Sequence, residues 1–266
     1  MTFVDKFTAE IIGLHVALYH AQARLEARTD SEALHDLRIA VRRIRSLMRP
    51  FRTMDEMAKL NDVAAQVGRH TTPTRDLEVI IQELEKQGFP ELAQARRSRL
   101  SSSYDAILAG RPLKQLMAAL DAWPAGFRAV EFDGRLEHIQ HQIRKTLGKQ
   151  VGRLHAAIED VQFDRHELRI LVKRTRYLTE AFPDLSPLSK GEANLLKGLQ
   201  SALGDWHDHY QWCQKALVEK DLLPLHSVWS ECAASALQKA ELQLSDVAKQ
   251  LPKSSGKKKP PKMAAK

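Results

Sequence analysis

The chain has 266 residues, 43% of them hydrophobic and 28% charged, which is the composition of a soluble globular protein that forms one domain or two small ones. Two cysteines, the lack of a signal peptide and the lack of a membrane-spanning apolar run argue against a disulfide-rich secreted protein or a membrane protein, and predict a cytoplasmic one. Residues 252–266 hold six lysines and no acids, which leaves only +2 of the formal net charge of +8 for residues 1–251.

The body of the chain is therefore nearly neutral, and its positive charge is gathered on a few segments. Such segregation of charge favours a defined anion-binding site over non-specific electrostatic binding to acidic surfaces. The lysine-rich segment 252–266 is predicted to be a disordered tail.

Hydrophobic residues recur with helical spacing almost throughout, and the alternation of a β-strand is absent, so the predicted fold class is all-α. Helices are predicted at about 4–28, 31–52, 54–69, 74–87, 90–109, 112–122, 133–159, 164–182, 189–206, 208–220 and 226–250. Pro73 is read as a helix break. Asp30 or Ser31 is expected to cap the helix at 31–52, and Asp164 the helix at 164–182.

The helix at 31–52 carries a cationic stripe. With 100° per residue, its members share an arc of about 80° and, from Arg38 to Arg49, extend about 16 Å along the axis. The stripe consists of His35, Arg38, Arg42, Arg45 and Arg49. The opposite side is apolar and is expected to be buried; it consists of Leu37, Val41, Ile44, Met48 and Phe51.

This stripe lacks counter-charges. A solvated helix interleaves acids with bases, because like charges three or four residues apart repel. Here the arginines follow one another at those spacings with no acid among them, so an anion or an acidic neighbouring helix must neutralise them. Planar guanidinium groups form bidentate hydrogen bonds with phosphate oxygens, which favours neutralisation by a bound anion over neutralisation by an acidic helix. The alternatives are a solvated basic face and arginines paired with acids of neighbouring helices.

The helix at 133–159 has a basic face of its own. Its members lie within about 80° of one another and are His138, His141, Lys145 and Lys149.

The helix at 164–182 repeats the cationic stripe. The segment that begins at His35 recurs 131 positions later at His166, with basic residues again at the third, seventh, eighth and tenth following positions. In the first copy these are Arg38, Arg42, Arg43 and Arg45, and in the second Arg169, Lys173, Arg174 and Arg176. Such self-similarity predicts a duplicated unit, with repeats at about 1–123 and 124–251.

A glycine, a predicted turn and an aspartate follow each stripe. In the first half this segment runs from Gly68 through Arg75 to Asp76, and in the second from Gly204 to Asp208. Both aspartates are expected to cap a helix or orient an arginine.

The doubled His-x-x-Arg-x-x-x-Arg-Arg-x-Arg pattern resembles the CHAD family over about residues 1–250. The resemblance implies two four-helix halves, related by a pseudo-two-fold axis around a basic channel, and binding of inorganic polyphosphate at polyphosphate granules. The implied channel residues are Arg38, Arg42, Arg45, Arg169, Lys173 and Arg176, with His35 and His166 at its ends or walls and Arg43 and Arg174 as further candidates.

The second copy departs from the first in two places. It has Lys173 where the first has Arg42, and Glu180 where the first has Arg49, so the second stripe is expected to be shorter. A Glu-x-Glu-x-Lys strand motif, which some family members carry in a fused domain, is absent, so a stand-alone member is expected.

The expected function is non-catalytic binding of polyphosphate by the duplicated stripes, the residues 138–149 face and Arg75, with no cofactor, metal or membrane contact. Polyphosphate, and through it granule proteins, are the expected partners. One alternative is a nucleic-acid-binding protein aided by the tail, although few aromatics interleave with the stripes. The other is a polyphosphate or nucleotide phosphohydrolase, which would need a carboxylate-held metal that the sequence does not locate.

Overall fold

The computed structural model describes residues 2–251, and within them every regular element is a helix, which confirms the all-α prediction. The predicted tail at 252–266 lies outside the described residues. The first elements are α1 (Phe3–Ala27), α2 (Ala33–Met48), η1 (Arg49–Phe51), α3 (Asp55–Lys86), α4 (Pro90–Arg97), α5 (Leu100–Ala109) and α6 (Arg111–Phe132). The later elements are α7 (Ile139–Glu159), α8 (Arg165–Ala181), η2 (Pro183–Leu185), α9 (Lys190–Val218), η3 (Lys220–Leu225) and α10 (His226–Gln250).

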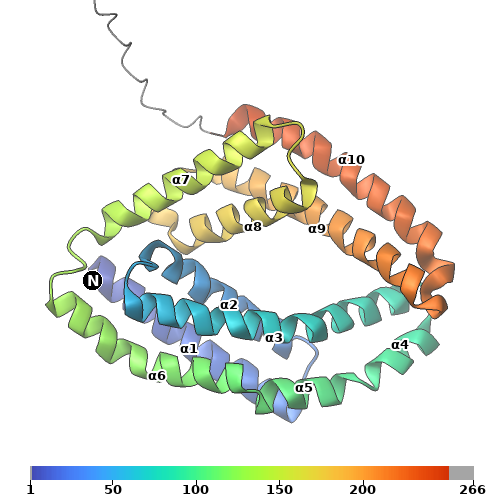
Figure 1. Cartoon of the computed structure of the whole chain (residues 1–266), viewed down its shortest axis with the longest axis horizontal. Helices are drawn as coiled ribbons and strands as arrows, with labels where there is room; N and C mark the ends of the chain where they lie inside the picture. The colour runs from blue at the N-terminus through green and yellow to red at the C-terminus, as the bar shows by residue number, and fades with distance from the viewer. Residues whose placement is uncertain (1, 252–266) are drawn as a thin grey trace, which may run out of the picture.

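The helices form a ring in which α2 and α8 face each other (Figure 1). α2 packs between α1 and α3, α8 packs between α7 and α9, and α2 also contacts α8. α10 lies along α9. Both halves thus place a striped helix between two others. The pseudo-two-fold relation and the boundary near residue 123 stay predictions.

Three apolar clusters hold the ring together. The largest surrounds Phe7 of α1, whose ring contacts those of Phe51 and Phe182, and it also takes Ile143 and Leu147 from α7. A second cluster joins α7, α8, α9 and α10. A third surrounds Trp229 of α10 and joins it to α3, α4 and α9. The two ends of α3 are therefore fixed by different clusters, and its middle crosses between them.

Several predicted helix breaks are wrong. α3 continues through Pro73 and α9 runs unbroken from Lys190 to Val218, so Asp76 and Asp208 lie inside helices and cap neither. Buried residues on both sides of Pro73, such as Val67 and Ile81, pack on the rest of the molecule and outweigh the cost of proline in a helix. Conversely, the predicted helix at 90–109 is divided into α4 and α5.

The caps of the two striped helices differ. Asp164 caps α8 as predicted, because its side chain accepts a hydrogen bond from the backbone N–H of Glu167 at 2.8 Å. The cap predicted for α2 is wrong: the N-cap residue is Glu32, which makes no side-chain capping bond, while Asp30 pairs with Arg24.

The apolar faces of α2 and α8 determine where their cationic faces point. Leu37 and Ile44 of α2 and Leu168 of α8 are fully buried in the clusters on either side. The opposite, cationic sides are therefore turned toward the space between α2 and α8. None of the described helices is long and apolar enough to span a bilayer.

Candidate anion-binding site

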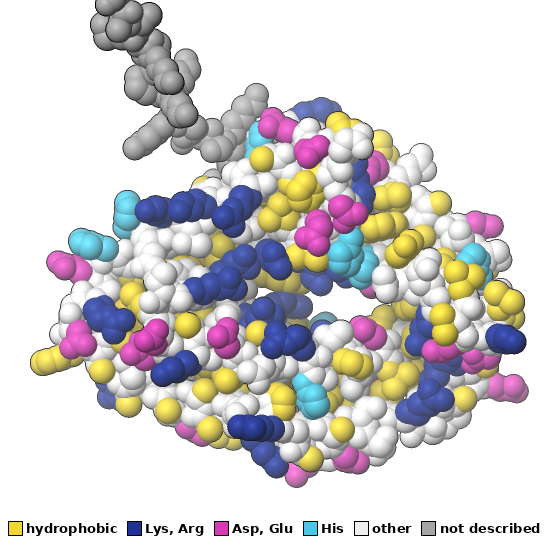
Figure 2. Space-filling view, viewed as in Figure 1, with side chains coloured by type: hydrophobic (Ala, Val, Ile, Leu, Met, Phe, Trp, Pro, Cys, Tyr) yellow, Lys and Arg dark blue, Asp and Glu magenta, His cyan; other side chains and the backbone are white. Residues whose placement is uncertain are grey.

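A cavity of about 390 Å³ lies between α2, α3 and α8, and we call it the basic groove. Nine cationic side chains line it, and no carboxylate among residues 2–251 does. Figure 2 shows Lys and Arg side chains gathered beside the central opening of the molecule. The cations of the basic groove are Arg38, Arg42, Arg45, Arg49, Arg52, Arg69, Arg169, Lys173 and Arg174.

Arg38 is anchored to α3. Its Nη1 atom donates to the carbonyl oxygen of Gly68 at 3.1 Å and to the hydroxyls of Thr71 at 2.7 Å and Thr72 at 3.2 Å. These bonds use one nitrogen of the guanidinium and fix its plane. The group is thus positioned by uncharged partners, without an ion pair within residues 2–251.

Arg42 reaches across to α8. Its guanidinium carbon lies 4.3 Å from the centroid of the Tyr177 ring, within the range of a cation–π contact. Arg176 approaches the same ring at 4.6 Å. The tyrosine therefore links the two striped helices and holds Arg42 in place while leaving its charge uncompensated.

Arg45 and Arg49 lie among like charges. Burial, followed by the nearby charges of Arg52 and Arg174, lowers the pKa of Arg49 to about 10, and burial and Arg52 lower the pKa of Arg45. The ion pairs formed within residues 2–251 include none with Arg38, Arg42, Arg45 or Arg49. The first stripe is therefore not paired with acids of neighbouring helices, and a bound anion would relieve its repulsion.

Lys173 is the one lysine of the basic groove. Burial, followed by the charges of Arg169 and Arg42, lowers its pKa to about 8. At neutral pH it is still mostly protonated, but it titrates close to physiological conditions.

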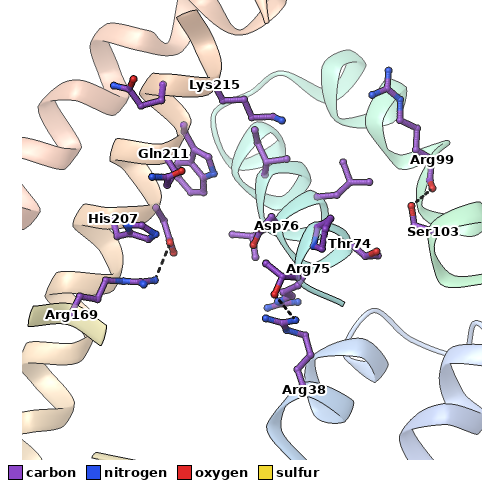
Figure 3. A pocket seen from close by; sticks show the side chains of 18 of the residues that line it. Arg38, Thr74, Arg75, Asp76, Arg99, Ser103, Arg169, His207, Gln211 and Lys215 are labelled. Carbon is purple, nitrogen blue, oxygen red and sulfur yellow. Dashed lines mark hydrogen bonds and ion pairs between the residues drawn. The ribbon is translucent and has the colours of Figure 1, made fainter. Parts of the chain in front are cut away.

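A second cavity of about 1070 Å³ continues from the basic groove, and we call it the mixed chamber. The two cavities share Arg38, Thr72, Arg169 and Lys173. Figure 3 shows Arg38 and Arg169 approaching the mixed chamber from different helices, with Asp76 and His207 further in. Both polar and apolar side chains line it, and they come from α2, α3, α5, α8 and α9.

Two aspartates distinguish the mixed chamber from the basic groove. The carboxylate of Asp208 lies 3.8 Å from Arg169, close enough to be its ion-pair partner, and the expected orienting role stays a prediction. Burial raises the pKa of both Asp76 and Asp208, and the nearby Arg38 and Arg169, respectively, oppose that rise. Burial, followed by Arg169, lowers the pKa of His207 to about 4, so this imidazole is neutral at pH 7.

Other predicted site residues lie outside the basic groove. Arg75 lines the mixed chamber but pairs with Glu78 at 2.8 Å. Arg43 pairs with Glu10 on the outer side of α2. Arg176 donates to Gln200 and Glu180, both at 2.6 Å, and lines neither cavity, so its expected role in the channel stays a prediction.

The predicted histidines and the basic face of α7 line neither cavity. The pKa of the half-buried His35 is lowered by burial and then by Arg75, and the His166 ring lies 4.8 Å from that of His207. His138, His141, Lys145 and Lys149 are exposed on the outside of the ring.

Two cations of the basic groove were missed by the sequence reasoning. Arg52 continues the spacing of three and four residues that runs from Arg38 to Arg49, so the stripe itself could have revealed it. Arg69 comes from α3, and only the packing of α3 on α2 brings it to the groove. Within residues 2–251, no three His, Cys, Asp or Glu side chains are grouped so that they could hold a metal ion.

Comparisons with known proteins agree with this architecture. Residues 11–217 match the model of the CHAD domain family. A crystal structure of the CHAD domain from the plant Ricinus communis superposes with a TM-score of 0.64 at 20% sequence identity, covering 94% of this chain and 91% of that one. No curated protein sequence matches the chain. Because the family model spans well over half of the sequence, this chain belongs to the CHAD domain family.

Proposed function

We propose that the basic groove binds inorganic polyphosphate without cleaving it. The observation that carries this proposal is the set of nine cations, eight of them arginines, with no carboxylate among them. Polyphosphate is a chain of anions without bases to read or stack on, so its recognition needs repeated guanidinium and ammonium groups along a groove. The family's link to polyphosphate supports the same ligand.

The basic face of α7 is proposed as an outer contact for long chains. Arg153 of α7 is close enough to Arg49 to lower its pKa, so α7 adjoins one end of the basic groove. A polymer that leaves the groove there would next meet Lys149 and Lys145. Such contacts would hold the protein in the cytoplasm at polyphosphate granules, where granule proteins become its neighbours.

Selectivity for polyphosphate is the test of the proposed function. We expect long-chain polyphosphate to bind more tightly than duplex DNA or tRNA at equal phosphate concentration, because the narrow basic groove has no stacking surface for bases: Tyr177 is already covered by Arg42 and Arg176. Fluorescence anisotropy on the full chain and on a chain ending at Leu251 measures this. Equal binding of all three polymers, lost with residues 252–266, would overturn the proposal in favour of tail-mediated nucleic-acid binding.

The absence of cleavage is tested in the same samples. Incubation with polyphosphate and Mg²⁺ should release no orthophosphate above the protein-free background. Release that EDTA abolishes would replace the non-catalytic proposal with a metal-dependent phosphohydrolase.

Binding should weaken as the pH rises above 8. In the free protein, Lys173 has a pKa of about 8. A bound anion favours the charged form of Lys173 and so raises this pKa. At a pH between the free and the bound value, binding must therefore be accompanied by uptake of a proton, and affinity falls as the pH rises. Loss of one charge-assisted contact corresponds to roughly 10- to 100-fold in affinity. Titrations from pH 7 to 9.5 should show this decline in the native protein and a much flatter profile in Lys173→Arg, and equal profiles would contradict the role of Lys173.

A further inference from the structure

The mixed chamber differs in charge from the basic groove that it adjoins. Beyond the four shared residues, its cations are Arg75, Arg99 and Lys215, and its acids are Asp76 and Asp208. Arg75 is already paired with Glu78, so the added charge is close to zero. The charged side chains of the groove are thus all cations, whereas the chamber adds two carboxylates, two glutamine amides and Trp212.

A bare polyphosphate chain gains little by extending into the mixed chamber. Past Arg38 and Arg169 it would meet Asp76 and Asp208, which both line the chamber. Two carboxylates beside a polyanion repel it and accept no hydrogen bond from fully ionised phosphates. The strongest sites for a bare chain therefore lie in the basic groove.

The remaining lining suits an organic group that carries hydrogen-bond donors. Carboxylates accept hydrogen bonds from amines and hydroxyls, and the amides of Gln211 and Gln214 both donate and accept. Leu77 and Trp212 supply apolar and aromatic surface on neighbouring walls. The volume of about 1070 Å³ is slightly above the usual range for pockets that bind small organic ligands, so the chamber has room for a nucleoside.

We propose that the mixed chamber binds the nucleoside part of a nucleoside polyphosphate, while the phosphates lie on Arg38, Arg169 and Lys173. These three cations join the two cavities, so one ligand can use both at once. Base amines and ribose hydroxyls would donate to Asp76 and Asp208, and the base would lie against the Trp212 side of the chamber. This site shares cations with the proposed polyphosphate site but does not require that long chains bind.

The test compares ATP with tripolyphosphate, which has the same number of phosphates and no nucleoside. By calorimetry on the full chain we expect ATP to bind at least about tenfold more tightly, because only ATP has groups that fill the mixed chamber. Equal or weaker binding of ATP would overturn the proposal. Long-chain polyphosphate is titrated separately, so that its failure to bind, with the ATP preference intact, would remove the proposed function and leave this site.

The double variant Asp76→Asn/Asp208→Asn should change the two ligands unequally. Tripolyphosphate should bind more tightly because two repelling charges are gone, and the ratio of ATP to tripolyphosphate affinity should fall toward one because the acceptors of the nucleoside are weakened. Asp246→Asn is a single-charge control, since Asp246 is exposed on α10, lines neither cavity and, within residues 2–251, pairs with Lys249. An ATP preference that persists in the double variant would place the nucleotide elsewhere and overturn the proposal.

Discussion

Replacing Arg38 and Arg169 together with alanine should weaken binding of long-chain polyphosphate by roughly 100- to 10,000-fold, which corresponds to two charge-assisted contacts. These side chains come from matching positions of the two copies and line both cavities. Arg38 is fixed by three hydrogen bonds to α3, and Arg169 lies 3.8 Å from the carboxylate of Asp208. Little ordering is therefore needed when a phosphate binds, and anisotropy titrations would measure the loss.

The matched control is Arg43→Ala/Arg165→Ala. It removes two charges of the same sign from the same two helices, but Arg43 pairs with Glu10 and Arg165 with Glu241, and neither lines the basic groove or the mixed chamber. Its affinity should stay within a few-fold of that of the native protein. Thermal unfolding of both variants separates lost binding from lost fold, because Arg38 also holds α3. Native affinity in a folded Arg38→Ala/Arg169→Ala protein would exclude the basic groove as the binding site.

The stripe of α2 shows what the sequence could predict. Its helical spacing predicts one apolar and one cationic face. Because Leu37 and Ile44 are buried in the core, the cationic face lies on the opposite side of the helix. Arg42 and Arg45 accordingly lie in the basic groove. Arg43, by contrast, belongs to the repeated motif but lies about 80° from the His35 direction, away from the stripe, and it pairs with Glu10 on the outside.

The second copy departs from the first because two nearby residues bind Arg176. Arg45 and Arg176 hold equivalent positions in the motif, and four residues further on lies Arg49 in α2 but Glu180 in α8. Glu180 accepts a hydrogen bond from Arg176, whereas the charge of Arg45 repels that of Arg49 and lowers its pKa. The sequence predicted a shorter second stripe for this reason. It could not predict that Arg176 would leave the cavity wall entirely, because Gln200 of α9 also holds it.

The mixed chamber could not be predicted from local patterns. The sequence placed Asp76 and Asp208 after turns, but both lie within long helices whose continuity depends on burial at either end. Their positions along one cavity result from the facing of α3 and α9 across the ring (Figure 1). Arg69 reaches the basic groove by the same kind of tertiary placement. The spacing of apolar residues predicts a helix and its buried face, but it does not predict which other helix will face it across a cavity.

Salt should affect polyphosphate binding as strongly as the arginine substitutions do. Each phosphate that the protein neutralises releases a condensed counterion, so the logarithm of affinity falls linearly with the logarithm of salt concentration. If six or more of the nine groove cations contact the chain, affinity should fall by about 10³- to 10⁵-fold between 50 and 200 mM salt. Titrations at four or more salt concentrations give the slope.

The slope also identifies which cations are engaged. Removal of Arg38 and Arg169 should reduce it by about two, because each lost phosphate contact lowers it by about one. A chain ending at Leu251 should keep most of its slope, since the nine cations that define the basic groove all belong to residues 2–251. A slope that is unchanged in the double variant but collapses on truncation would mean that the six lysines of residues 252–266 carry the electrostatic contact. In that case, the basic groove would not be the polyphosphate site, and the clustered arginines of α2 would have to bind a different anion.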